Sequence, residues 1–179
     1  MVKITVTKKQ LALLKAHISK SASDSEAMRN LALYDNYIVA SDGKTACYIE
    51  CSSIFDSGCY AFIGAPDKLA PKLFEISLLK LDIDAPNFKA VKPDLLKLKS
   101  TALTLDNTPL NTTSAVLKVF ELTGNAINFE YLHRIAKANP ADYLVYYSDK
   151  DKPIVLVDSE AKAEIIVLPF KYKQKANSL

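Results

Sequence analysis

The two ends of this chain show the same order of hydrophobic periodicities, and this repetition restricts the fold more than any single motif does. Residues 2–7 alternate polar and apolar side chains, as a half-buried strand does. Thr7 and Gln10 then form a T-x-x-Q capping box, which predicts that a helix begins at once. Its apolar face carries Leu11, Leu14 and Ile18.

Strands are predicted to follow this helix. The β-rich runs are residues 31–34, 37–40 and 45–51. Asp35-Asn36 is a typical two-residue hairpin turn, and residues 41–44 (S-D-G-K) predict a second turn. The first 52 residues thus predict a β-α-β-β-β unit.

The same order returns near the C-terminus. Residues 126–129 are predicted to be extended, and Asn128 can cap a helix that continues to about residue 138 and turns Leu132, Ile135 and Ala136 inward. Three strands are then predicted, at residues 143–147, 154–157 and 163–170. Because one helix on a small sheet cannot bury its own apolar face, the two units are expected to pack together.

The chain is therefore predicted to be an α+β protein with helices packed on antiparallel sheets. Four segments are expected: a repeat-like unit at 1–57, a divergent middle at 58–124, a second unit at 125–172 and a basic tail at 173–179. In the middle, residues 66–79 have helical spacing interrupted by Pro71. Predicted strands there are residues 59–64, 78–83, 95–105 and 115–122, with 92–99 a helix as the alternative.

Composition favours a soluble, cytoplasmic protein. Apolar residues make up 49% and charged residues 24%, and no apolar run or leader-like segment predicts a membrane span or secretion. The net charge of +3 permits an anionic partner without implying one. Three cysteines without a C-x-x-C pair, and two histidines predicted at surface or boundary positions (His17 and His133), do not suggest a metal site.

No catalytic motif is evident, so neither an enzyme nor a cofactor is predicted. The four glycines form no phosphate-binding loop, and no G-x-S-x-G is present. Asp42, next to Gly43, is better explained as a turn residue than as a catalytic carboxylate.

Three stretches resemble the bacterial DNA sliding clamp, the beta subunit of the replicative DNA polymerase, in its second and third domains. Residues 37–46 (Y-I-V-A-S-D-G-K-T-A) are similar to the strand and T-D-G-H-R-L-A turn of that family. Residues 127–135 (I-N-F-E-Y-L-H-R-I) resemble its final helix, and residues 163–170 (A-E-I-I-V-L-P-F) its terminal strand. The resemblance extends over roughly 100 residues, which is more specific than one short motif.

The resemblance implies a processivity factor whose helices line a channel around duplex DNA. Sliding requires attraction to phosphates without contacts to base edges, a task suited to basic side chains on the helices. The candidates for this sequence-independent DNA contact are Lys9, Lys15, Lys20, Lys68, Lys72, Arg134 and Lys137. Lys68 and Lys72 are placed on the predicted middle helix. Solvated surface charge is the alternative for each of them.

The family also has a groove that binds short peptides of DNA polymerase and other clamp-binding proteins. By resemblance the groove residues here are Ser41, Gly43, Ala46, Tyr131, Ile166, Leu168 and Phe170. This sequence has Thr45 where the family has Arg, Ala46 where it has Leu, and Leu168 and Phe170 where it has Met, so its partner preference is expected to differ. Ordinary core positions in a half-buried strand are the alternative for Ile166 and Leu168.

The length of 179 residues suggests a shortened, phage-type version of the clamp. A ring of the usual six domains would need more copies, and one and a half domains per chain would predict a homo-oligomer, a tetramer with head-to-tail contacts. The alternatives are an adaptor or inhibitor that binds partner proteins without encircling DNA, and an unrecognised enzyme.

Overall fold

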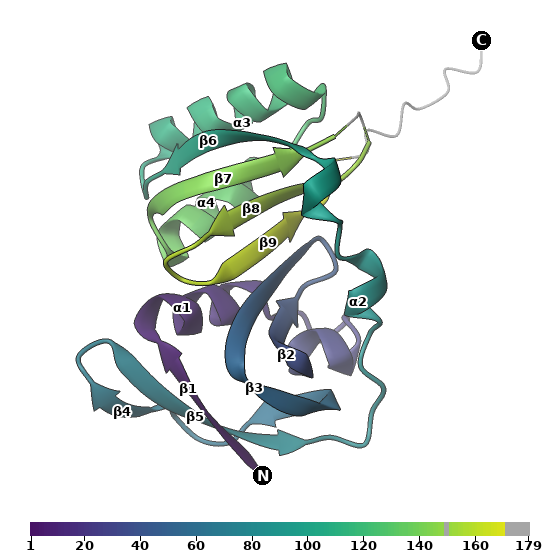
Figure 1. Ribbon diagram of the computed structural model, residues 1–179, viewed down its shortest axis with the longest axis vertical. Helices are drawn as coiled ribbons and strands as arrows, with labels where there is room; N and C mark the ends of the chain where they lie inside the picture. Colours follow the sequence, from purple (N-terminus) through teal and green to yellow (C-terminus); the bar gives the residue numbers. More distant parts are fainter. Residues whose placement is uncertain (149–150, 171–179) are drawn as a thin grey trace.

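A computed structural model describes residues 1–148 and 151–170 of the chain. Its centre is a nine-stranded sheet. Seven of the strands follow the order β1-β5-β3-β9-β8-β7-β6, and the other two lie outside this order, where β2 pairs with β3 and β4 with β5. All pairs are antiparallel. The helices α1, α4 and α3 lie on one face of the sheet (Figure 1). The predicted α+β class is confirmed.

The first half of the molecule contains five strands and α1. The strands are β1 (Val2–Thr7), β2 (Leu31–Ser41), β3 (Thr45–Phe62), β4 (Asp67–Ala70) and β5 (Leu73–Lys80). Helix α1 (Lys8–His17) begins at the predicted capping box, in which Thr7 Oγ1 accepts from the Gln10 backbone and Gln10 Oε1 accepts from the Thr7 backbone. A 3-10 turn, η1 (Glu26–Arg29), leads into β2.

The second half also combines an antiparallel sheet with helices, here four strands and two helices. Its elements are β6 (Lys99–Leu105), α3 (Pro109–Thr123), α4 (Phe129–Ala138), β7 (Ala141–Tyr147), β8 (Ile154–Asp158) and β9 (Ala163–Val167). Helix α4 begins where predicted, because the Asn128 side chain accepts from the Glu130 backbone, and it buries Leu132, Ile135 and Ala136 as expected.

Strand β3 joins the two halves. It is 18 residues long and pairs with β2 along one edge. On its other edge, Tyr60 to Phe62 pair with β5 of the first half, and Thr45 to Ile49 pair with β9 of the second half. The sheet therefore continues from one half into the other, and the beginning of β3 is set beside the end of the chain.

Side chains pack on both faces of the sheet. The larger core lies between the sheet and the helices and includes Leu13, Leu14, Leu132 and Ile135, all fully buried. The smaller core, on the opposite face, includes Tyr48, Phe88, Val155 and Ile166. It is covered by the connector, residues 81–98, which contains α2 (Phe88–Val91) and the 3-10 turn η2 (Leu95–Lys97). The connector thus covers the sheet at the β3–β9 boundary.

Two predictions in the terminal regions, a hairpin turn and a short strand, differ from the structure. Residues 31–41 form one continuous strand, because Asp35, with φ of 47°, is accommodated as an irregularity of the β2–β3 ladder instead of a turn. Residues 126–129 are not a strand. Asn125, just before them, is tied to the β7–β8 loop by hydrogen bonds with Asp151 and Lys152, and the edge of the sheet is formed by β6.

The middle of the chain was predicted least well. Residues 66–79 form the β4–β5 hairpin, not a helix, because β5 pairs with β1 and buries alternate residues Ile76 and Leu78. Residues 115–122 lie in α3, not in a strand. Thr108 as N-cap, Pro109 in the first turn and Gly124 at φ 68° as C-cap frame this helix.

The two histidines are buried, contrary to the prediction. His17 is fully inaccessible at the end of α1, with Nδ1 2.7 Å from the Leu13 carbonyl, and His133 is 8% exposed. Both follow from helical spacing, since His17 lies one turn after Leu13 and Leu14, and His133 lies one turn before Ala136.

Acid should destabilise the protein through His17. Burial lowers the pKa of His17 to about 4, below the 6.5 of an unfolded chain. The contribution is intact above pH 6.5 and is lost as the pH falls towards 4, because the unfolded chain takes up a proton that the native state refuses. We expect unfolding at pH 5 to require about 2 kcal/mol less than at pH 7.

Urea unfolding midpoints at pH 7, 6 and 5 measure this slope. His17→Gln, which keeps a polar side chain but cannot titrate, should flatten the slope over that interval. An equal slope in the variant would mean that other groups carry the acid sensitivity.

Candidate functional site

An apolar groove lies where β3, β9 and the connector meet. It has a volume of about 660 Å³. One wall is the turn between β2 and β3, the floor is the end of β9, and the opposite wall is α2 with the residues before it. Lining residues from these parts are Ser41, Gly43, Lys44, Thr45, Ala46, Pro86, Asn87, Phe88, Ala90, Val91, Ile166 and Leu168, joined by Met28 and Pro153.

A second hollow of about 440 Å³ adjoins the first. Tyr131 and Phe170 line it, and it shares Lys44, Pro153 and Leu168 with the groove. Leu168 is 41% exposed and Phe170 54% exposed, whereas Ile166 at the floor is 5% exposed. The pair of hollows therefore offers accessible apolar side chains on a rigid base, as sites for short apolar peptide segments do.

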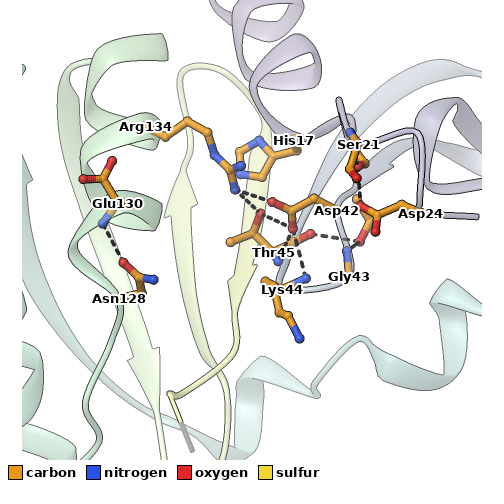
Figure 2. Close-up of polar contacts among 12 residues, drawn as sticks. His17, Ser21, Asp24, Asp42, Gly43, Lys44, Thr45, Asn128, Glu130 and Arg134 are labelled. Atoms are coloured by element: carbon orange, nitrogen blue, oxygen red, sulfur yellow. Dashed lines mark hydrogen bonds and ion pairs between the residues drawn. The ribbon is translucent and has the colours of Figure 1, made fainter.

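The turn that forms the near wall is held by side-chain hydrogen bonds. Asp42 Oδ1 accepts from the backbone N–H of Lys44 at 2.9 Å and of Thr45 at 2.7 Å. Ser41 Oγ donates to the Thr45 carbonyl, and Gly43 adopts φ of 77°, a conformation that favours glycine. The turn is thus fixed by its own residues (Figure 2).

Arg134 reaches this turn from helix α4. Its Nη2 lies 2.7 Å from Asp42 Oδ2 and 2.8 Å from Thr45 Oγ1 (Figure 2). Burial alone would raise the pKa of Asp42, but the backbone N–H groups of Thr45 and Lys44 and the Arg134 guanidinium hold it below its usual value. The Asp42 carboxylate is therefore ionised at neutral pH and tied to α4.

A basic depression lies on the helix face, between α1 and α4. It has a volume of about 770 Å³. Its basic lining residues are Lys15, Lys20, Lys44, Arg134 and Lys137, and Asp24 and Asp42 are the acidic ones. Lys15, Lys20 and Lys137 are exposed. Since Arg134 is ion-paired, the exposed lysines are the charges available to an external anion.

The connector is held against the sheet by aromatic and charged contacts. The Tyr48 hydroxyl donates to the Phe88 carbonyl at 3.0 Å, and the two rings meet edge to face. Lys92 Nζ lies 3.0 Å from Glu164 of β9 and 4.0 Å from the Tyr37 ring centroid. These contacts place α2 opposite the turn and define the width of the groove.

Comparisons with known proteins find the same architecture in solved structures. No family model and no curated protein sequence matches the chain. A DNA polymerase sliding clamp from Caulobacter crescentus superposes with a TM-score of 0.59 at 14% identity, with 95% of this chain and 65% of that chain covered. The beta subunit of DNA polymerase from Streptococcus pyogenes gives 0.58 at 10% identity, with 96% and 66% covered.

A third match is the sliding clamp (DNA polymerase III subunit beta) from Bartonella birtlesii, solved with bound griselimycin. It gives a TM-score of 0.58 at 13% identity, with 95% of this chain and 66% of that chain covered. The chain has the DNA sliding clamp fold. It spans slightly less than two thirds of the length of these clamps.

Within this clamp fold, the residues predicted for the peptide groove come together. Ser41, Gly43, Ala46, Ile166 and Leu168 line the larger hollow. Tyr131 and Phe170 line the adjoining one with Leu168. The β3–β9 ladder, with Ala46 opposite Ile166, places the turn beside the terminal strand. Their role in binding stays a prediction.

The residues predicted to face DNA lie in three different parts of the structure. Lys15, Lys20, Arg134 and Lys137 share the basic depression of the clamp fold. Lys9 lies at the start of α1 and pairs with Glu160 at 2.6 Å. The middle helix predicted to carry Lys68 and Lys72 is a β-hairpin instead. Lys68 lies on β4, and Lys72 lies in the turn between β4 and β5.

Sequence reasoning missed the connector wall of the groove. Pro86, Phe88 and Val91 line it, but the connector has no periodicity that predicts where it packs. Asn87 could have indicated the start of α2, since its side chain caps this single helical turn by accepting from the Ala90 backbone N–H.

The described residues offer no candidate metal site and no membrane-spanning helix. Residues 1–148 and 151–170 bring together no group of three or more His, Cys, Asp or Glu side chains able to hold a metal ion. Among those same residues, each helix is too short or too polar to cross a membrane.

Proposed function

We propose that the protein is a sliding-clamp processivity factor, which holds DNA polymerase or other replication and repair proteins on duplex DNA. The observation that carries this proposal is the position of the turn at residues 41–45. Lys44 lines the apolar groove on one side and the basic depression on the other. A peptide in the groove and DNA along the helices would thus be held next to each other.

The helix face suits sequence-independent contact with DNA. Lys15, Lys20 and Lys137 are exposed on or beside neighbouring helices, and lysine side chains attract phosphates over a distance without reading base edges. Such contact allows a protein to move along the duplex. It needs neither a cofactor nor a reaction, and we propose no catalytic role for Asp42 or any other residue.

The groove suits a peptide with apolar anchors. Leu168 lies between the two hollows, where one side chain can contact two anchors in succession. Buried apolar anchors give most of the affinity of such complexes. Since Leu168 and Phe170 are accessible, the peptide would cover surface that is exposed in the free protein.

A ring would require several copies of this chain, as in the homo-oligomer predicted from its length. The two ends of the described sheet are β1 and β6, each paired on one side only. Beside β6, the outer side of α3 exposes Leu110 (79%), Leu117 (57%) and Phe120 (52%) at helical spacing. We propose that this α3 stripe, with β6, contacts the β1 end of the next copy in head-to-tail closure.

The combined change Leu117→Asp and Phe120→Asp should convert the assembly into monomers. Two charges in a desolvated contact have no partner there, and the expected weakening is at least about 100-fold. Light scattering after size-exclusion chromatography measures the mass. Leu96→Asp, at a side chain that is 96% exposed on η2, is the matched control and should leave the mass unchanged.

Retention on DNA tests the whole function. The protein, assembled on a nicked circular plasmid with whatever loader is needed, should stay bound through gel filtration and leave after the plasmid is linearised. Equal loss from circles and linear DNA would contradict encirclement. A monomer that binds clamp-binding peptides but not DNA would support the second candidate, an adaptor or inhibitor.

A further inference from the structure

Arg134 was predicted to face DNA, yet its contacts point elsewhere. Its side chain is 33% exposed, and that of its partner Asp42 is 13% exposed. Nη2 donates to Asp42 Oδ2 and to Thr45 Oγ1, while Thr45 Oγ1 donates to Asp42 Oδ1. These three side chains form a closed set of hydrogen bonds between α4 and the β2–β3 turn (Figure 2).

The same turn is a wall of the groove. Gly43, Lys44 and Thr45 all line it, and the carboxylate that Arg134 holds also accepts the backbone N–H groups of Lys44 and Thr45. A charged hydrogen bond on the inner side of the turn therefore sets the backbone on its outer side. Helix α4 contributes Tyr131 to the second hollow as well, so one helix reaches both parts of the groove.

We propose that Arg134 is a positioning residue of the peptide groove, which acts through Asp42 and does not contact DNA. This inference rests on the proposed peptide-binding function. The groove is open to peptide only while the turn keeps its shape, and the Arg134–Asp42 pair fixes that shape from the helix side. Because the pair is mostly shielded from water, its effect persists at salt concentrations that abolish contacts with phosphates.

The test measures the affinity of a fluorescein-labelled clamp-binding peptide from a DNA polymerase by fluorescence anisotropy. Arg134→Gln should weaken it by roughly tenfold, the loss expected for one charged hydrogen bond. Asp42→Asn should weaken it similarly, and the double variant should lose no more than either alone. Arg134→Lys, which can still reach Asp42 as a point charge, should recover part of the loss.

The matched control is Lys97→Gln, which removes a basic side chain paired with Asp94 at 3.1 Å on η2, away from the groove. It should leave peptide affinity unchanged. All measurements are made at 0.15 M and 0.5 M NaCl, and the loss in Arg134→Gln should be the same at both. Amide signals of Lys44 and Thr45 in ¹⁵N spectra should shift in Arg134→Gln and Asp42→Asn alike, while thermal unfolding checks that each variant is folded.

The outcomes separate the two proposals. If the unmodified protein binds no such peptide, the proposed groove function fails. If it binds and folded Arg134→Gln binds equally well, the positioning role is wrong and the pair is merely structural. If Arg134→Gln loses DNA retention but not peptide, Arg134 belongs with the DNA-facing lysines instead.

Discussion

Replacing Lys15, Lys20 and Lys137 with Glu should abolish binding of the protein to short duplex DNA at physiological salt. These three exposed lysines share the depression between α1 and α4. Each neutralised phosphate contributes close to one unit to the dependence of log affinity on log salt, so the slope should fall by about three. Charge reversal adds repulsion, and the affinity at 0.1 M salt should fall by at least about 1,000-fold.

Binding to a fluorescent 30-base-pair duplex, titrated from 50 to 300 mM NaCl, measures both quantities. Arg134 is left unchanged because its substitution would disturb the turn. The control replaces Lys80, Lys89 and Lys97 with Glu, which changes the net charge equally at the end of β5 and in the connector, away from the depression. Equal losses in the two triple variants would mean that total charge, not the helix face, attracts DNA.

Leu168→Asp should remove peptide binding from a folded protein. Leu168 lines both hollows and is 41% exposed, so a carboxylate there costs little in the free protein but would be desolvated beneath a bound peptide. The expected loss is at least about 100-fold in affinity, as for a central anchor contact. Fluorescence anisotropy with a labelled clamp-binding peptide measures it.

Leu144→Asp is the matched control for this change. Leu144 is 47% exposed on β7, away from the groove, and should accept Asp with peptide affinity intact. DNA binding by Leu168→Asp should also stay within about twofold of the unmodified protein, since one charge outside the helix face is largely screened. Normal peptide binding by Leu168→Asp would show that the peptide binds elsewhere.

The terminal regions were predictable because their signals are local. The Thr7–Gln10 capping box fixed the start of α1, and Asn128 fixed the start of α4. Resemblance then named groove residues at both ends of the chain, and the β3–β9 ladder explains why residues 120 positions apart lie together. In this ladder Ala46 lies opposite Ile166, so a groove residue from each end of the chain meets the other.

The middle could not be predicted because tertiary contacts decide it. Residues 66–79 have a spacing that fits a helix, but pairing with β1 and within the β4–β5 hairpin makes strands of them. For α3, the capping residues Thr108, Pro109 and Gly124 were legible in the sequence, whereas its exposed Leu110, Leu117 and Phe120 obscured the amphipathic pattern. Apolar side chains on the outer face of a helix weaken the periodicity on which such predictions depend.

The length of β3 has a mechanical consequence. Since this strand is hydrogen-bonded to β5 in one half and β9 in the other, the two halves, as residues 1–148 and 151–170 describe them, cannot separate without breaking one of these ladders. An assembly of such rigid bodies that must admit a closed DNA circle can part only at the seams between copies. The opening that admits DNA would therefore lie between two copies of the chain, and a covalent cross-link across every contact between copies would prevent DNA from entering.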